Sequence, residues 1–289
     1  MANIRRIRRR ILTARNIAQI TKAMELVAAS KMRKAQAAAV SGKLYAEKIH
    51  EMVMRLSARA DASHHPLLTR PKILTGKRII VFVSTNKGLC GGLNANLFRF
   101  HDASYPRAEN FAYITCGTKG AMHVAGRKSE LLADFSTVVP FTVSVGAITE
   151  LVRTRFISGA YDGADLVFNE FVSVLQQVPK RKTILPLTLE AIRSNDNTAE
   201  QYAPKDTLIE PGVRDVFDAL IPHYLENQIR DAILEAEASE HSARMIAMRN
   251  ATDNAMSLME ELTLIYNKAR QEKITYEISD IVTARLAVE

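Results

Sequence analysis

The chain has 289 residues, which is enough for one large domain or for a modest domain with extensions. Its only two cysteines exclude a disulfide framework, and the lack of any uncharged apolar stretch of about eighteen residues argues against a membrane-spanning helix. The net charge of +8 is concentrated in residues 1–48, where twelve Lys and Arg residues stand against two acids, and this predicts an acidic partner: nucleic acid, anionic lipid or an acidic protein surface.

The N-terminal segment, residues 1–60, is predicted to be a long helix, because no proline occurs before Pro66 and the first glycine is Gly42. Apolar residues recur in steps of mostly three or four, as expected for one face of a helix. The members of this stripe are Ile4, Ile7, Ile11, Ile17, Ile20, Met24, Val27, Ala28, Met32, Ala35 and Ala39. The stripe shifts by one residue near position 14, and an antiparallel partner that curls around the helix can follow that shift.

Residues 72–193 have a different sequence pattern from the two terminal segments, and this pattern predicts an inserted α/β domain. Short β-branched runs bounded by charged residues or glycines are typical of buried parallel strands. Strands are expected at residues 77–84, 111–117, near 138–139, at 165–171 and at 183–189. Helices are expected from about residue 95, through Leu132 and over residues 144–159. Strands that alternate with helices indicate a parallel, Rossmann-like α/β layer.

The C-terminal segment, residues 213–289, is predicted to be a second long helix after a polar loop at residues 194–212. No glycine or proline follows Pro222, so an unbroken helix from there would span on the order of 100 Å. Its alanine-rich stripe consists of Leu225, Ile229, Ala232, Ala236, Ala243, Ile246, Ala251, Leu258, Leu262, Ile265, Ala269 and Ile281. Each terminal helix has a stripe that nothing else covers, so we expect a long antiparallel coiled coil that extends from the inserted domain.

The glycine-rich turn at residues 86–94 is the first candidate for chemistry, because a strand, a glycine turn and a helix start can hold a phosphate. Its sequence G-L-C-G-G-L-N matches neither the dinucleotide fingerprint nor the P-loop, which favours a tight structural turn over a nucleotide site. Cys90 in this turn is interpreted as a small buried side chain, with a nucleophile at a helix N-terminus as the alternative.

The remaining polar residues do not assemble a nucleophile, a base and an oxyanion donor, so no catalytic, cofactor or metal site is expected. Glu240 and His241 do not form the H-E-x-x-H pattern of a zinc site. Gln271, Thr275 and Glu277, beside Arg270, have in isolation the pattern of a solvated helix face.

Four segments resemble the gamma subunit of F-type ATP synthases, and they occur in the expected order from the start of the chain to its end. They are Ile20–Met32; Lys87–Asn94; Glu237–His241 with Arg244, Met245, Ala247 and Met248; and Tyr266–Gln271 with Ile274, Thr275, Glu277 and Ile278. Together they are highly specific, and they span essentially the whole chain.

The resemblance implies a rotor shaft, with the terminal helices inside a ring of three alpha and three beta subunits. It places the α/β domain near the epsilon subunit and the c-ring of the membrane sector. It implies a non-catalytic subunit without a cofactor, which couples proton flow through the c-ring to ATP synthesis or hydrolysis on the alpha and beta subunits. It also implies a peripheral position on the cytoplasmic side of a bacterial inner membrane.

The resemblance also implies which residues contact the partners. Met24, with Lys22 nearby, matches the position that faces an acidic lever loop of a beta subunit. The residues that match contacts to the catalytic subunits near the C-terminus are Arg270, Gln271, Thr275 and Glu277. The last segment, Ile281–Leu286, departs from the small Gly/Ala-rich tail of the family and carries Arg285.

Two rival functions follow from the same residues. A nucleic-acid-binding protein with a basic helical arm would bind DNA or RNA with a steep salt dependence, although the arm lacks the aromatic residues of single-strand binders. An α/β enzyme that uses the glycine-rich turn and Cys90 would bind a nucleotide or turn over a substrate on its own.

Overall fold

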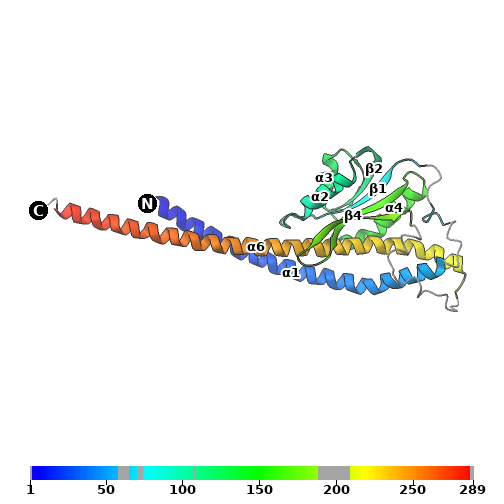
Figure 1. Ribbon diagram of the computed structural model, residues 1–289, viewed down its shortest axis with the longest axis horizontal. Coiled ribbons are helices and arrows are strands. Elements are labelled where there is room, and N and C mark those ends of the chain that lie inside the picture. The colour runs from blue at the N-terminus through cyan, green and yellow to red at the C-terminus, as the bar shows by residue number, and fades with distance from the viewer. Residues whose placement is uncertain (1, 58–64, 70–73, 107, 188–208, 287–289) are drawn as a thin grey trace. The chain divides into compact units, whose positions relative to one another are not determined.

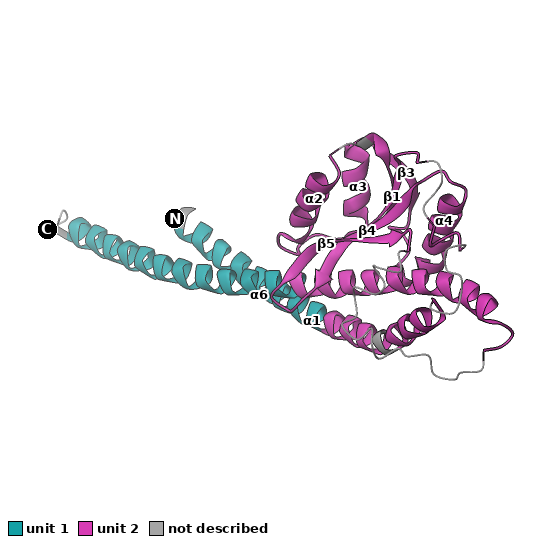
Figure 2. Ribbon diagram, turned by 45° about the vertical axis from the view of Figure 1, so that its right-hand side comes forward, with its two compact units in different colours: residues 1–29, 244–289 teal, residues 30–243 magenta. Residues whose placement is uncertain are grey.

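A computed structural model describes residues 2–57, 65–69, 74–106, 108–187 and 209–286. The chain forms two compact units (Figures 1 and 2). We call residues 1–29 with 244–289 the coiled-coil unit, and residues 30–243 the α/β unit. The helices α1 (Ala2–Ser57) and α6 (Val213–Leu286) each contribute to both units, and the prediction of two long terminal helices is confirmed. None of the described helices is long and apolar enough to cross a membrane.

The α/β unit contains a five-stranded sheet with the strand order β3-β2-β1-β4-β5. The strands are β1 (Arg78–Val83), β2 (Phe111–Cys116), β3 (Glu130–Asp134), β4 (Gly163–Phe171) and β5 (Gln177–Leu185). The shorter helices are α2 (Leu93–Ser104), α3 (Thr118–Gly126) and α4 (Val145–Ile157), with 3-10 turns η2 (Ala108–Asn110) and η3 (Phe141–Ser144). Strands β1 to β4 are parallel, whereas β5 runs antiparallel to β4. The predicted α/β class with a mainly parallel sheet is confirmed.

Side chains on β1 alternate between two hydrophobic cores of the α/β unit, as the period of two in a strand requires. Ile79 and Val81 pack in the core that contains α4 and the unit's parts of α1 and α6. Ile80 and Phe82 pack in the core on the other face, with Leu97 of α2 and Val124 of α3. Because both faces are covered, β1 is a continuous apolar run, as is typical of a parallel strand.

The third strand and the helix before it were predicted wrongly. The helix expected to run through Leu132 ends at Gly126, and Lys128 then adopts a left-handed conformation with φ of 56°. The strand expected near residues 138–139 lies at Glu130–Asp134 instead. Its residues are partly exposed because β3 is an edge strand, so it lacks the unbroken apolar run that identifies β1. Residues 138–139 are exposed and lie in the irregular segment before η3.

The last strand was also misplaced, because it was expected at residues 183–189 as part of a parallel layer. It begins at Gln177 and ends at Leu185, while residues 188–189 lie outside the described residues. This edge strand follows β4 after a short connection, which permits only antiparallel pairing. The first half of the strand is polar and contains Pro179, so the sequence has no apolar run there that would indicate a strand.

Candidate interaction surface

The two helices of the coiled-coil unit are antiparallel and are joined by polar contacts. The hydroxyl oxygens of Thr21 and Thr252 lie 2.7 Å apart, and Arg249 Nε donates to Glu25 Oε1 at 3.2 Å. As the residue number rises on α1, the number of its partner on α6 falls. The predicted antiparallel coiled coil is therefore present in this unit.

The seam of the coiled-coil unit is built largely from small side chains. The buried residues on α1 are Ile7, Ala14, Ala18, Glu25 and Ala28. Those on α6 are Met245, Met248, Thr252, Ala255 and Leu262. Alanine lets two helix backbones approach closely but buries little apolar area. The polar members therefore have a large part in fixing the register.

Part of the predicted stripe on α1 does not lie in the seam. Ile17, Ile20 and Val27 are exposed by 46%, 59% and 57%. Ile17 and Val27 precede the seam residues Ala18 and Ala28, and Ile20 precedes Thr21, whose hydroxyl contacts Thr252; one residue is about 100° around the helix. Leu12 and Leu26 are exposed as well. This outer face of α1, which we call the α1 apolar face, is an unusual surface for a protein without a partner, since large exposed apolar patches mark interaction sites.

Glu25 is the charged member of the seam and is only 5% exposed. Lys22 Nζ donates to Glu25 Oε2 at 3.0 Å, and Arg249 approaches the other oxygen. The hydrogen bond from Lys22 is the main reason that the pKa of Glu25 is lowered; burial opposes the shift, and Arg249 adds to it. The carboxylate thus joins a cation on its own helix to one on the partner helix.

Glu25→Gln is expected to weaken the coiled-coil unit by about 1 kcal/mol at neutral pH, because both cations reach solvent. Since folding lowers the pKa of Glu25, its stabilisation exists above the ordinary pKa of a glutamate and is lost as the pH falls through the lowered value. Thermal unfolding, followed by circular dichroism from about pH 7 to about pH 3, should show a smaller acid loss in the variant. The exposed Glu260→Gln is the control, and identical profiles for E25Q and wild type would contradict the assignment.

Of the residues expected to contact partners, Lys22 and Met24 lie beside this seam. The Lys22 side chain is 55% exposed, although it is paired with Glu25. Met24 is half-buried, so part of its thioether side chain is available to a partner. The structure thus places both residues next to the α1 apolar face.

The other four expected contact residues lie farther along α6 and are all exposed. They are Arg270, Gln271, Thr275 and Glu277. Thr275 Oγ1 donates to the Gln271 carbonyl at 3.0 Å, and Lys273 pairs with Glu277 at 3.0 Å. The register of Glu25 with Arg249 puts Thr275 beyond the first residue of α1, where α6 continues alone (Figure 2). About 30 Å of helix separates this group from Lys22 and Met24, so the six residues form two groups.

The segment of α6 beyond α1 exposes large apolar side chains, most of them along one face of the helix. Ile274, Ile278, Ile281 and Val282 share this face, and Tyr276 lies on the opposite side; they are exposed by 47% to 71%. An apolar stripe on a helix normally packs against another element, so this exposed stripe indicates an interaction surface.

A basic groove in the coiled-coil unit was not predicted from the sequence. It has a volume of about 450 Å³ and lies between the start of α1 and α6. Its lining consists of Arg6, Arg9, Arg10, Thr13, Ala14, Ile17, Leu258 and Leu262. The steps of three or four residues from Arg6 to Ile17 were visible in the sequence. Without the register, however, nothing showed that Leu258 lies opposite them.

The glycine-rich turn has the geometry of a tight connection between β1 and α2. Leu89 and Gly91 have φ of 62° and 59°, a left-handed conformation that glycine adopts readily. Asn94 Nδ2 donates to Thr85 Oγ1 at 2.7 Å and approaches Cys90 Sγ at 3.5 Å. Cys90 is buried, which agrees with the interpretation as a small packed side chain.

Known proteins match this chain over nearly its full length. Residues 3–288 match the family described as ATP synthase. The ATP synthase gamma chain of Opitutus terrae is 42% identical, covering 99% of both chains, and that of Methylacidiphilum infernorum is 39% identical, covering 100% of both. Among solved structures, a chain of the Euglena gracilis mitochondrial ATP synthase has the same fold, with a TM-score of 0.65 at 20% identity over 99% of this chain and 95% of that one. The central stalk and c-ring structure from Tetrahymena thermophila gives a TM-score of 0.58 at 24% identity, over 80% and 99%. The chain therefore belongs to the family of ATP synthase gamma chains.

Proposed function

We propose that this chain is the central rotor shaft of the F1 sector of an ATP synthase. It couples proton flow through the c-ring to ATP synthesis or hydrolysis on the alpha and beta subunits, and it carries no catalytic site itself. The main support is the coiled-coil unit, whose alanine-rich seam leaves large apolar and basic side chains exposed along both helices. Such a surface requires enclosure by other subunits.

The proposed ring around the coiled-coil unit is formed by three alpha and three beta subunits. Lys22 and Met24 face the beta subunits at one level, and the exposed end of α6 from Arg270 to Glu277 faces the catalytic subunits at another. The α/β unit contacts the epsilon subunit and the c-ring, which holds the chain peripherally at the cytoplasmic side of a bacterial inner membrane. The functional division is that expected from the sequence: residues 1–60 and 213–289 as shaft, residues 72–193 as the α/β domain and residues 194–212 as a connecting loop.

The charge of the shaft suits exchange between three similar partners. Exposed ion pairs contribute only about 0.2–1 kcal/mol each, so the basic helix can be attracted to acidic loops in turn without being trapped by one. Because the shaft is asymmetric, each catalytic subunit meets a different surface. Rotation then interchanges their states, and this is a free-energy coupling between the sites.

Co-purification tests the proposal. An affinity-tagged copy of the chain, expressed in its own host, is expected to recover two larger subunits together with ATPase activity. Recovery of the chain without any such ATPase would refute the proposed function, and retention of nucleic acid instead would favour the rival interpretation.

Met24→Lys is expected to impair coupling more than folding. The site is half-buried beside Lys22, so the longer cation can reach solvent, and we expect unfolding to change by no more than about 1 kcal/mol. The added charge stands where an acidic loop of a beta subunit is proposed to pass, so the shaft is held there too strongly. Assays in membrane vesicles should show ATP-driven proton pumping reduced more than ATP hydrolysis. Met24→Leu is the control, and normal pumping by M24K would contradict the proposed contact.

A further inference from the structure

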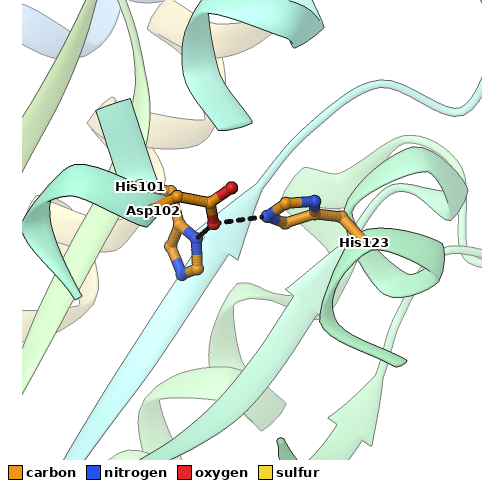
Figure 3. Close-up of side chains that lie close together, drawn as sticks. All are labelled: His101, Asp102 and His123. Atoms are coloured by element: carbon orange, nitrogen blue, oxygen red, sulfur yellow. Dashed lines mark hydrogen bonds and ion pairs between the residues drawn. The ribbon is translucent and has the colours of Figure 1, made fainter. Parts of the chain in front are cut away.

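We propose that His101, Asp102 and His123 form a binding site for a divalent transition-metal ion of the zinc class. The site lies in the α/β unit, and its residues are not among the six that are proposed to contact the alpha and beta subunits. It would link α2 to α3 on one face of the sheet (Figure 3).

Two helices bring the three side chains together. His101 and Asp102 lie near the end of α2, and His123 lies on α3. His101 Nδ1 and His123 Nε2 lie 3.1 Å and 3.0 Å from the same oxygen, Asp102 Oδ1 (Figure 3). One ligand atom from each side chain lies within 4.8 Å of the other two. A small outward movement of these atoms would make room for an ion between them.

The donor set has the chemistry of a transition-metal site. Two imidazole nitrogens and one carboxylate oxygen suit zinc, with bonds of about 2.0–2.2 Å, whereas magnesium and calcium prefer oxygen ligands. Three protein ligands leave the fourth position of a tetrahedral ion for water. The end of α2 contributes further, because the partial negative charge of a helix C-terminus favours a cation.

Neighbouring side chains fix the orientation of both histidine rings. His101 is fully buried, and its Nε2 lies 3.0 Å from the Tyr113 hydroxyl. His123 stacks on Phe98 with ring centres 4.4 Å apart and planes inclined by 5°. Both rings are thus fixed with a nitrogen toward Asp102.

An ion can reach the site from solvent on the side of the carboxylate. His101 is fully buried, but the Asp102 side chain is 46% exposed.

Arg127 competes with the ion for the carboxylate. Its Nη1 donates to Asp102 Oδ1, and its Nη2 donates to the Tyr105 carbonyl at 2.5 Å. An ion must displace the first contact, because two cations on one oxygen repel each other. Arg127→Gln should therefore bind the metal more tightly than wild type.

Titration calorimetry of the untagged full chain with zinc chloride tests the proposal. We expect one equivalent to bind, and we expect His123→Gln and Asp102→Asn to lose more than the roughly 10- to 100-fold that removal of an outer-shell partner costs. His223→Gln is the control, since this exposed histidine on α6 pairs only at 3.9 Å with Glu226 and should not change the affinity.

Two further measurements distinguish the loss of a metal ligand from the loss of the folded structure. Circular dichroism should show the same helix content in all variants, and zinc should raise the Tm of wild type but not of H123Q. Cobalt should give the visible absorption of a site with nitrogen and oxygen ligands, stronger in Arg127→Gln. Absence of zinc binding by the wild-type chain, or undiminished binding by a folded H123Q, would overturn the proposal.

Discussion

Gly117→Ala is expected to destabilise the α/β unit on the order of 4 kcal/mol, from backbone strain and overpacking together. Gly117 connects β2 to α3 with φ of 105°, a conformation that L side chains rarely adopt. A Cβ there would stand 2.3 Å from the Ser84 carbonyl oxygen and 2.6 Å from its carbon. Ser84 cannot withdraw, because its N–H donates to the Cys116 carbonyl at 2.7 Å.

Urea unfolding monitored by circular dichroism measures this effect. Gly146→Ala is the matched control: Gly146 lies in α4, nothing stands within 4 Å of its added Cβ, and alanine should stabilise the helix by about 1 kcal/mol. A G117A midpoint equal to that of wild type would show that the turn relaxes at little cost.

Asp165→Ala should cost about 3 kcal/mol, the lower end of the range for breaking a buried ion pair. Asp165 is completely buried in β4 and accepts from Arg78 Nη2 at 2.7 Å and Arg181 Nη2 at 3.1 Å. It also accepts from the Tyr105 hydroxyl at 3.0 Å and from Thr183 Oγ1 at 2.8 Å. This one carboxylate therefore joins β1, β4, β5 and the end of α2. The cost stays near the lower limit because both arginines reach solvent.

The same urea titration measures this cost, with Glu150→Gln as the control. Glu150 pairs with Arg153 on the surface of α4, where solvent screens the pair, so its loss should change stability little. A D165A loss no larger than that of E150Q would mean that the buried network adds little to stability.

The long helices could be predicted from the sequence because they contain almost no helix-breaking residues: Gly42 is the only glycine or proline in α1, and Pro222 is the only one in α6. The seam was harder to predict. Ala14 and Ala18 carry too little apolar area to stand out, whereas the larger Ile17 and Ile20 also recur in a helical step and yet lie outside the seam. Which stripe is buried depends on how closely the partner backbone approaches, and that is a tertiary property. The edge strands β3 and β5 were misplaced for a related reason, since strands buried on one face do not show a continuous apolar run.

The candidate interaction surface and the proposed metal site were also only partly predictable from the sequence. Lys22, Met24 and the residues near the end of α6 came from a family resemblance, and no spacing rule would have selected them. Glu25 could not be paired with Arg249 until the register of the two helices was known. His101 and His123 are separated by a whole strand, in no spacing typical of a metal motif. Only the packing of α2 against α3 brings them to one carboxylate.

Rotation of this chain during ATP hydrolysis tests the central claim most directly. A cysteine introduced at Leu175, which is 84% exposed in the α/β unit, can carry a fluorescent label, whereas Cys90 and Cys116 are buried. With the surrounding subunits immobilised, the label is expected to turn in one direction when ATP is added and to stop when ATP is removed. A complex that hydrolyses ATP at its normal rate while the label stays fixed would contradict the proposed shaft.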